Sequence, residues 1–350
     1  MKKFLKYFLS TIVVLMTLFF LQELLVPKYV TDLPEGSMIS EYYDEERMDH
    51  DVIFIGDCEI YENYSPITMW EEYGINSYLR GTSQQCMWQT YGVLEDTLKY
   101  ETPKAVVVNV MSMRFNEPQS EAYNRMTLEG MRWSKTKVDT IKASMMKNET
   151  FISYVFPMLR YHERIWELTE EDFEYYLKSD KVVHNGYLMR VDIRPVDYIP
   201  TAKPLGDYSF GENAWLYLDK IRETCEAKGV ELILVKAPSV YPHWYDEWDE
   251  NIVQYAAEHG LSYYNLYYVA DEIGIDYQVD TFDEGLHMNL TGAEKVARYF
   301  GRILQEEHGI PDRRGEEELS RIWEEKIAFY EADRIAKEAA WEEEQKREEE

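Results

Sequence analysis

Residues 52–59 read VIFIGDCE, and this stretch decides the predicted fold. Its first four residues are β-branched or aromatic, which is typical of a strand buried on both faces of a parallel sheet. The Gly-Asp pair that follows predicts a tight turn at the end of the strand. Similar apolar runs at residues 105–110 and 232–235, and a shorter one at 262–266, predict further strands.

Helical patterns separate these strands. They lie at residues 83–100, 212–228, 247–259 and 291–308. Strands that alternate with helices predict an α/β fold, here a doubly wound, mainly parallel sheet between two layers of helices. Ligands of such sheets bind beyond the carboxyl ends of the strands, so we expect a site near Gly56, Val110 and Lys236.

The N-terminus predicts a membrane anchor over residues 1–26. Three lysines precede an uncharged stretch of 16 residues at 7–22, and a bilayer needs roughly 20 apolar residues. No small-residue cleavage site follows, which favours an uncleaved signal anchor over a cleaved signal peptide. A buried core helix is the alternative, and the N-terminal position and flanking charges disfavour it. Because the lysines come first, we expect a single-pass protein of the cell membrane with an extracytoplasmic main domain.

The rest of the chain divides into three parts, the second of which contains an insertion. We expect a polar, acidic linker at 27–50, an α/β domain at 51–310 and an acidic helical tail at 311–350. Residues 117–205 interrupt the alternation with a Tyr-, Trp- and Met-rich stretch, which predicts a helical insertion that packs over or beside the site. The tail predicts a surface helix that frays toward its end.

Composition excludes several classes of function. A net charge of −29 makes a nucleic-acid partner improbable, because phosphate binding needs clustered Lys and Arg. The three cysteines, Cys58, Cys86 and Cys225, form no C-x-x-C pair, so neither a disulfide framework nor a zinc cluster is indicated. No P-loop, G-x-G-x-x-G or H-E-x-x-H pattern is present, and no cofactor or metal is expected.

Cys58 and His287 are the residues with the clearest chemical potential. Cys58 directly follows the Gly-Asp turn, where its own backbone N–H could contribute to an oxyanion site. His287 lies in a polar loop just before the last helix and could act as its base, with Asp283 or Glu284 orienting the imidazole. The alternatives are an inert buried thiol for Cys58 and a loop-bracing role for His287.

Two segments resemble the SGNH/GDSL hydrolase family. Residues 55–58 (IGDC) are similar to its first block, a strand ending in Gly-Asp-Ser, with Cys in place of the nucleophilic Ser. Residues 287–293 (HMNLTGA) look like the ending common in its membrane-anchored, DltD-like branch. The resemblance implies a three-layer, flavodoxin-like sandwich in which Cys58 is the nucleophile, His287 the base and Asp283 the orienting acid.

The resemblance also implies oxyanion donors, and here the sequence departs from the family. Gly81 fits the place of the family's second donor. The third block, Gly-x-Asn-Asp, has no match at residues 110–116, where Asn116 or Ser112 could substitute. Asp283 stands four positions before His287, whereas the family's acid stands three positions before its histidine, and Gly285 could absorb the extra residue in the turn.

Two functions follow from this resemblance. The first is an esterase or O-acyltransferase that acts on a cell-envelope glycan or polymer through a covalent acyl-enzyme on Cys58. The second is a catalytically inactive scaffold that serves as a binding or assembly subunit. The resemblance implies a membrane-bound O-acyltransferase as a partner in either case.

Overall fold

The computed structural model describes residues 2–26, 36–170, 172–173 and 181–348. Its centre is a five-stranded sheet with the order β2-β1-β3-β4-β5, and every neighbouring pair is parallel. The strands are β1 (Val52–Gly56), β2 (Ser77–Gly81), β3 (Ala105–Asn109), β4 (Glu231–Lys236) and β5 (Ser262–Asn265). The strand order turns back on itself beside β1, so the crevice expected of such a sheet opens at the carboxyl ends of β1 and its neighbours.

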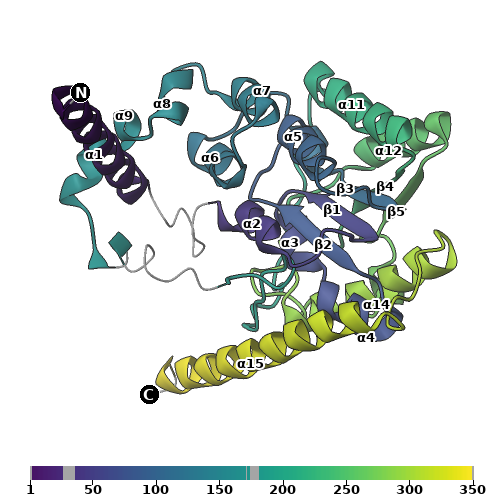
Figure 1. The fold of residues 1–350 in the computed structure, drawn as a ribbon. Helices are drawn as coiled ribbons and strands as arrows, with labels where there is room; N and C mark the ends of the chain where they lie inside the picture. Colours follow the sequence, from purple (N-terminus) through teal and green to yellow (C-terminus); the bar gives the residue numbers. More distant parts are fainter. Residues whose placement is uncertain (1, 27–35, 171, 174–180, 349–350) are drawn as a thin grey trace.

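Helices cover both faces of the sheet, which gives the predicted three layers (Figure 1). Alternate strand residues point to opposite faces. Phe54, Val107 and Ile233 pack against α4 (Pro66–Tyr73) and α14 (Leu290–Glu306). The intervening residues of the same strands pack on the other face against α5 (Met87–Thr97), α11 (Glu212–Lys228) and α12 (Asp246–His259). Both cores are apolar, which explains why the strands read as continuous apolar runs.

The insertion forms a helical layer beside the domain and a strap along the sheet. Its helical elements are α6 (Glu121–Gly130), α7 (Lys135–Ser144), α8 (Phe151–Val155), α9 (Met158–Tyr161) and the 3-10 turn η3 (His162–Trp166). Further on, the Asn185 carbonyl accepts a 2.9 Å hydrogen bond from the backbone of Leu79 in β2. Asn185 and Gly186 therefore cover the middle of the edge strand β2, which would otherwise expose unpaired backbone groups.

Most of the predicted linker is part of the folded domain. Residues 27–35 lie outside the described part of the chain, but α2 (Ser37–Ser40) and the 3-10 turn η1 (Glu41–Asp44) follow directly. Met38, Ile39 and Tyr42 of these elements are buried, and the Tyr42 hydroxyl donates a 2.5 Å hydrogen bond to Glu101. The prediction of a polar linker up to residue 50 is therefore wrong for residues 36–50, because these apolar side chains complete the core.

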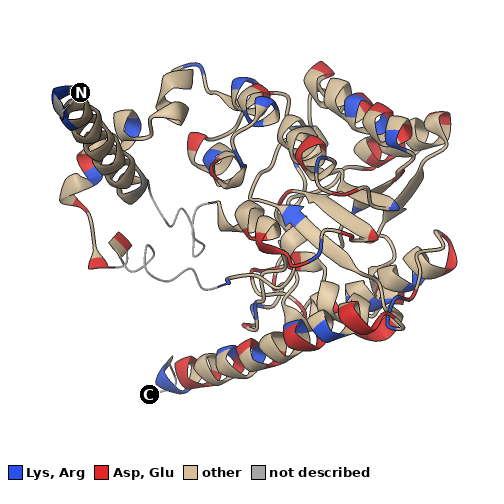
Figure 2. Ribbon diagram, viewed as in Figure 1, with Lys and Arg blue, Asp and Glu red and all other residues tan. Residues whose placement is uncertain are grey.

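The acidic tail forms one long helix, α15 (Glu317–Glu348), that runs along the molecule (Figures 1 and 2). Trp323 is fully buried and stacks on Trp70 of α4 with ring centroids 4.9 Å apart. Leu319 and Tyr330 are buried in the same core. The first half of α15 is thus a structural element of the domain, whereas Figure 2 shows charges of both signs along its length.

Helix α1 (Lys2–Leu25) projects from the domain at the N-terminal end (Figure 1). Its segment Lys3–Gln22 is long and apolar enough to cross a membrane, and none of this segment is buried inside the protein.

Candidate active site

The thiol of Cys58 lies at the carboxyl edge of the sheet, as the first residue of α3 (Cys58–Asn63). Asp57 caps this helix by accepting a 3.2 Å hydrogen bond from the backbone N–H of Glu59. A Cβ atom on Gly56 would come within 2.9 Å of the Asn109 side chain. The turn from β1 to α3 can therefore pack directly on β3 only because residue 56 is glycine.

The loop before α14 presents His287 to this turn. The backbone N–H of His287 donates to Asp283 Oδ1, and imidazole Nδ1 lies 2.7 Å from Asp283 Oδ2. Glu284 and Gly285 adopt positive φ angles of 62° and 91°, and the Glu284 side chain is exposed. These two left-handed residues absorb the extra residue in the loop, so Asp283 and not Glu284 contacts the imidazole.

A second carboxylate, which the sequence analysis missed, faces the same nitrogen. Glu62 Oε2 lies 2.9 Å from His287 Nδ1. Because Nδ1 carries a single hydrogen, which Asp283 accepts, the Glu62 contact is an ion pair without its own hydrogen bond. Glu62 stands four residues after Cys58 in α3, so helical spacing is the sequence signal that could have placed both side chains on one face.

Asn63 joins the parts of the site that come from distant parts of the chain. Its Oδ1 accepts a 2.7 Å hydrogen bond from the backbone N–H of Met288, and its Nδ2 donates to Ser239 Oγ at 3.2 Å. Asn63 is fully buried. It therefore fixes the histidine loop and the loop after β4 to the helix that carries Cys58.

The side chains of Cys58 and His287 interact with each other. Burial raises the pKa of the Cys58 thiol, and the nearby imidazole counteracts this only in part. Burial alone would lower the pKa of His287, but Glu62, Cys58 and Asp283 outweigh it and hold that pKa well above its usual value. Among the described residues, no hydrogen-bond partner contacts the buried Nε2 of His287.

The two predicted oxyanion residues lie in different places. Gly81 ends β2 directly beside Gly56, and a Cβ on Gly81 would come within 2.9 Å of the Asp57 carbonyl. Asn116 is exposed, and its Oδ1 accepts a 2.9 Å hydrogen bond from the backbone N–H of Asn213 at the start of α11. The structure thus places Gly81 against the Cys58 turn, whereas the side chain of Asn116 is occupied elsewhere and its prediction as a substrate-binding residue is not supported.

Buried polar groups lie beneath the turn, among them Ser112, which the sequence analysis names as a possible substitute in the third block, and Asn109, which it does not identify. Asn109 Nδ2 donates to Asp57 Oδ1 at 2.7 Å, and the Ser112 hydroxyl lies 3.2 Å from Asp57 Oδ2. Lys236, at the end of β4, forms a 2.8 Å ion pair with Glu59. Burial and the neighbouring Glu59 raise the pKa of Asp57. This buried network ties α3 to β3 and β4 and so fixes the direction in which Cys58 points.

Apolar side chains border the thiol. Cys58 packs against a small cluster formed by Met38, Tyr61, Val183 and Leu188. On the other side, Phe282 stacks on the His287 imidazole with ring centroids 5.9 Å apart. A site with a thiol, an oriented imidazole and apolar walls can in chemical terms perform nucleophilic attack on an ester or thioester carbonyl.

Comparisons with known proteins support no family assignment. No protein-family model matches the sequence, and no curated protein is similar to it. Among solved structures, a GDSL-like lipase from Bacteroides thetaiotaomicron is similar with a TM-score of 0.36 and 12% identity, over 78% of this chain and 100% of the lipase.

Two further structures give comparable values. A protein described as lipolytic and of the G-D-S-L family, from Desulfitobacterium hafniense, has a TM-score of 0.36 and 12% identity over 74% of this chain and 100% of its own. One described as an acylhydrolase, from Bacteroides fragilis, has a TM-score of 0.35 and 11% identity over 75% and 89%. At this level of likeness the chemistry of the site rests on the residues of this chain.

Proposed function

We propose that this protein is an acyl-ester hydrolase or O-acyltransferase that forms a covalent acyl-enzyme on Cys58. The observation that carries the proposal is the triad-like arrangement in which Asp283 Oδ2 lies 2.7 Å from His287 Nδ1 and the imidazole interacts with the Cys58 thiol. Nucleophile, base and orienting acid in this order are the general requirement for acyl transfer by a thiol or hydroxyl.

The reaction proceeds in two halves. Cys58 Sγ attacks the ester carbonyl while its proton passes to His287 Nε2, and the backbone N–H groups of Cys58 and Gly81 stabilise the oxyanion. The C–O bond of the ester then breaks, and the leaving alcohol takes the proton from Nε2. Water, or a hydroxyl group of an acceptor, attacks the resulting thioester with His287 again as base, which releases the acyl group and restores the thiol.

The substrate we propose is a cell-envelope glycan or polymer. Support comes from α1, whose apolar segment would anchor the domain at a membrane, with the domain on the extracytoplasmic side as the N-terminal lysines predict. The similarity of residues 287–293 to DltD-like proteins is the basis for a membrane-bound O-acyltransferase as partner.

A second candidate function is that of an inactive binding or assembly subunit. One feature favours it: burial raises the pKa of the Cys58 thiol, while Glu62 and Asp283 raise the pKa of His287, and both shifts oppose transfer of the thiol proton to the imidazole. A protonated imidazole cannot accept the thiol proton. The two candidates therefore differ in whether Nε2 becomes unprotonated at the pH where the protein works.

Iodoacetamide labelling and hydrolysis of a short-chain aryl ester distinguish the two candidates. We expect the full-length protein to be labelled at Cys58 and to release the aryl alcohol, and both activities to be lost in Cys58→Ala and reduced at least tenfold in His287→Ala. Cys225→Ala is the matched control, because that thiol lies on the buried face of α11, in a different core cluster from Cys58. Equal, slow labelling of wild type and His287→Ala, without turnover at any pH, would contradict the enzymatic candidate and support the binding or assembly subunit.

A further inference from the structure

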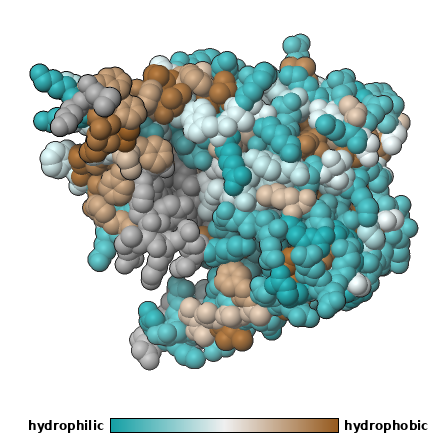
Figure 3. Space-filling model, viewed as in Figure 1, coloured by the Kyte–Doolittle hydropathy of each residue, from teal (hydrophilic) through white to brown (hydrophobic). Residues whose placement is uncertain are grey.

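The insertion exposes a cluster of large apolar side chains on one surface. Five of them lie within residues 151–166, and Trp133 on the loop after α6 adds a sixth. We call this set the apolar face; it consists of Trp133, Ile152, Phe156, Leu159, Ile165 and Trp166. Trp166 is 90% exposed, which is unusual for a tryptophan on a water-facing surface. Figure 3 shows hydrophobic surface that continues from α1 onto the neighbouring helices.

Helix α1 is fixed to this part of the insertion. It lies against α9 and η3, and Arg164 Nη1 donates a 2.9 Å hydrogen bond to the Leu25 carbonyl at the end of α1. Leu24 and Leu25 are themselves buried. The apolar face therefore has a defined position relative to the segment that is long enough to cross a bilayer.

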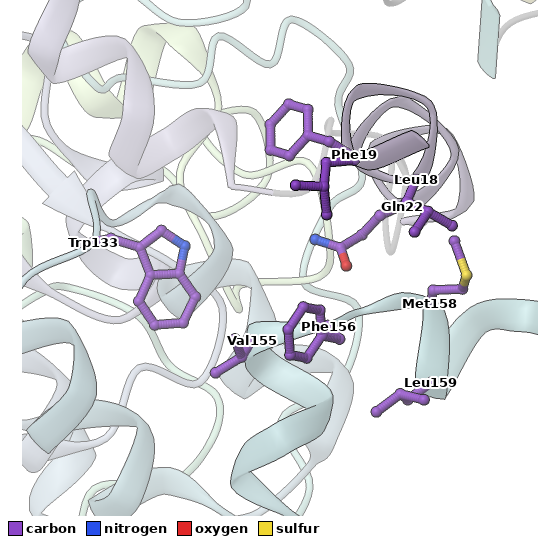
Figure 4. Close-up of a pocket in the computed structure, with 9 residues that line it drawn as sticks. Leu18, Phe19, Gln22, Trp133, Val155, Phe156, Met158 and Leu159 are labelled. Carbon is purple, nitrogen blue, oxygen red and sulfur yellow. The ribbon is translucent and has the colours of Figure 1, made fainter. Parts of the chain in front are cut away.

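A cavity of about 530 Å³ separates α1 from the apolar face. Its lining is almost entirely apolar and comprises Leu15, Leu18, Phe19, Gln22, Trp133, Val155, Phe156, Met158 and Leu159. Figure 4 shows Phe19 and Gln22 of α1 opposite Phe156 and Trp133 of the insertion. Water would gain few hydrogen bonds in such a space, whereas hydrocarbon would fill it favourably.

The depth of this cavity follows from the geometry of α1. The 20-residue segment Lys3–Gln22 spans about 30 Å, the thickness of the hydrocarbon core of a bilayer. Leu15 lies seven residues before Gln22, and so about 10 Å inside the hydrocarbon. Phe156 and Leu159 line the same cavity as Leu15, which places them within the outermost part of that leaflet.

We propose that the apolar face is embedded in the leaflet that meets the domain, and that lipid acyl chains occupy the cavity beside α1. The inference rests on α1 crossing the bilayer and is independent of the chemistry of Cys58. Interfacial helices insert to a depth of about 5–10 Å, in agreement with the position of Leu159, and exposed tryptophans such as Trp166 favour the membrane boundary.

Charge makes little contribution to this attachment. Residues 151–170 contain two arginines and three glutamates, and Arg160 and Arg164 form ion pairs with Glu121 and Asp172. The whole chain carries a net charge of −29. Apolar burial must therefore drive the insertion, so zwitterionic lipid should suffice and salt should have no effect.

Fluorescence in liposomes tests the proposal. The full-length protein with Cys58→Ser would carry Leu159→Cys labelled with an environment-sensitive NBD dye and be reconstituted into phosphatidylcholine vesicles. Val253→Cys on α12 is the matched control, because Val253 is 49% exposed and lies on a helix that packs on the sheet far from α1 in sequence. We expect blue-shifted NBD emission at 159, strong quenching by lipids with spin labels in their acyl chains, and no change in 0.5 M NaCl.

Further variants separate the outcomes. Ile152→Ser with Phe156→Ser should markedly reduce the quenching at 159 while α1 keeps the protein in the vesicle. An NBD emission maximum at position 159 that matches the maximum at position 253 would show that both dyes are in water and would overturn the proposal. A second result would also overturn the proposal, namely no quenching in vesicles of pure lipid but a blue shift in native membranes. That result would indicate that a membrane protein covers the apolar face.

Discussion

His287 is the residue on which the chemistry of the site depends, because it lies between a thiol and two carboxylates. Asp283 orients the ring through Nδ1, and Glu62 adds a second negative charge at 2.9 Å from the same nitrogen. Both charges favour the imidazolium form. The arrangement stabilises the charge that develops during attack, but it also delays the release of the proton until high pH.

Removing the charge of Glu62 should therefore shift the activity toward lower pH. Glu62→Gln lowers the pKa of His287, so Nε2 becomes unprotonated at a lower pH and can accept the thiol proton there. We expect the acid limb of the kcat/KM profile to move to lower pH, with a gain in activity at pH 7. The profile is measured by aryl-ester hydrolysis, and an unmoved limb would show that Glu62 does not influence the imidazole.

Removing the charge of Asp283 should have a different effect. In Asp283→Asn the imidazole loses the acceptor that fixes its tautomer, and we expect kcat to fall by about 10²-fold. Glu284→Gln is the matched control, because Glu284 is exposed, and its activity should stay within a factor of two of wild type. Equal losses of kcat in both variants would show that Asp283 does not have the orienting role that we assign to it.

Among the elements, α15 has the most unexpected role. Its apolar residues follow helical spacing, but the abundance of Glu and Lys around them conceals how deeply Trp323 is buried. Trp323→Ala would remove the indole that stacks on Trp70 at 4.9 Å and leave a cavity between α15 and α4.

We expect Trp323→Ala to lower the free energy of unfolding by about 3–5 kcal/mol. Ile335→Ala, on the same helix but 65% exposed, should change it by less than about 0.5 kcal/mol. Urea denaturation followed by circular dichroism measures both. A small, equal effect in the two variants would mean that α15 docks too weakly to stabilise the domain.

The sequence predicts an element well where the pattern that indicates the element lies within that element itself. Four of the five strands were predictable, because runs such as Val52–Gly56 are apolar along their whole length. The strand β2 was not among them, because Ser77 and Arg80 interrupt its apolar pattern. The core contribution of residues 36–44 was not, because the burial of Met38 and Tyr42 results from partners far away in the chain.

The site shows the same division. Asp283, His287 and Cys58 could be predicted from two local motifs, and the structure brings these three together. Asn116 follows β3 in the sequence, but its side chain accepts a hydrogen bond from the start of α11, almost a hundred residues later. The contact of Glu62 with the imidazole could not be predicted from a local motif, because it depends on the loop that carries His287 folding back against α3.

At the scale of the whole molecule, Glu45 connects the N-terminal part of the domain to its C-terminal helix. It forms an ion pair with Lys326 of α15 and lies 3.8 Å from His50. Burial opposes the charged form, but His50 and Lys326 outweigh it and lower the pKa of Glu45 to about 2. Burial also lowers the pKa of Lys326 despite this pair, so the net contribution is smaller than the shift of Glu45 alone indicates.

Stability should therefore fall in acid through Glu45. A carboxyl whose folded pKa lies below its unfolded value stabilises the protein above the unfolded pKa of about 4.5, and this contribution disappears as the pH falls toward 2. We expect Glu45→Gln to destabilise the protein by about 2 kcal/mol at pH 7 and clearly less at pH 3. Urea midpoints at both pH values provide the measurement, with the exposed Glu46→Gln as control. A difference that is the same at pH 7 and pH 3 would contradict this assignment.

The separation of Cys58 and His287 by 229 positions has a consequence for biosynthesis. Synthesis runs from the N-terminus, so the cysteine emerges long before the histidine loop, and before Val183 and Leu188 are present to cover it. During that interval the thiol lies on an unfinished sheet without its imidazole, without Asp283 and without the later part of its apolar cover. An oxidant that meets the nascent chain would attack a sulfur that the finished fold half-encloses. For this protein, the period in which the nucleophile is most vulnerable is its own production.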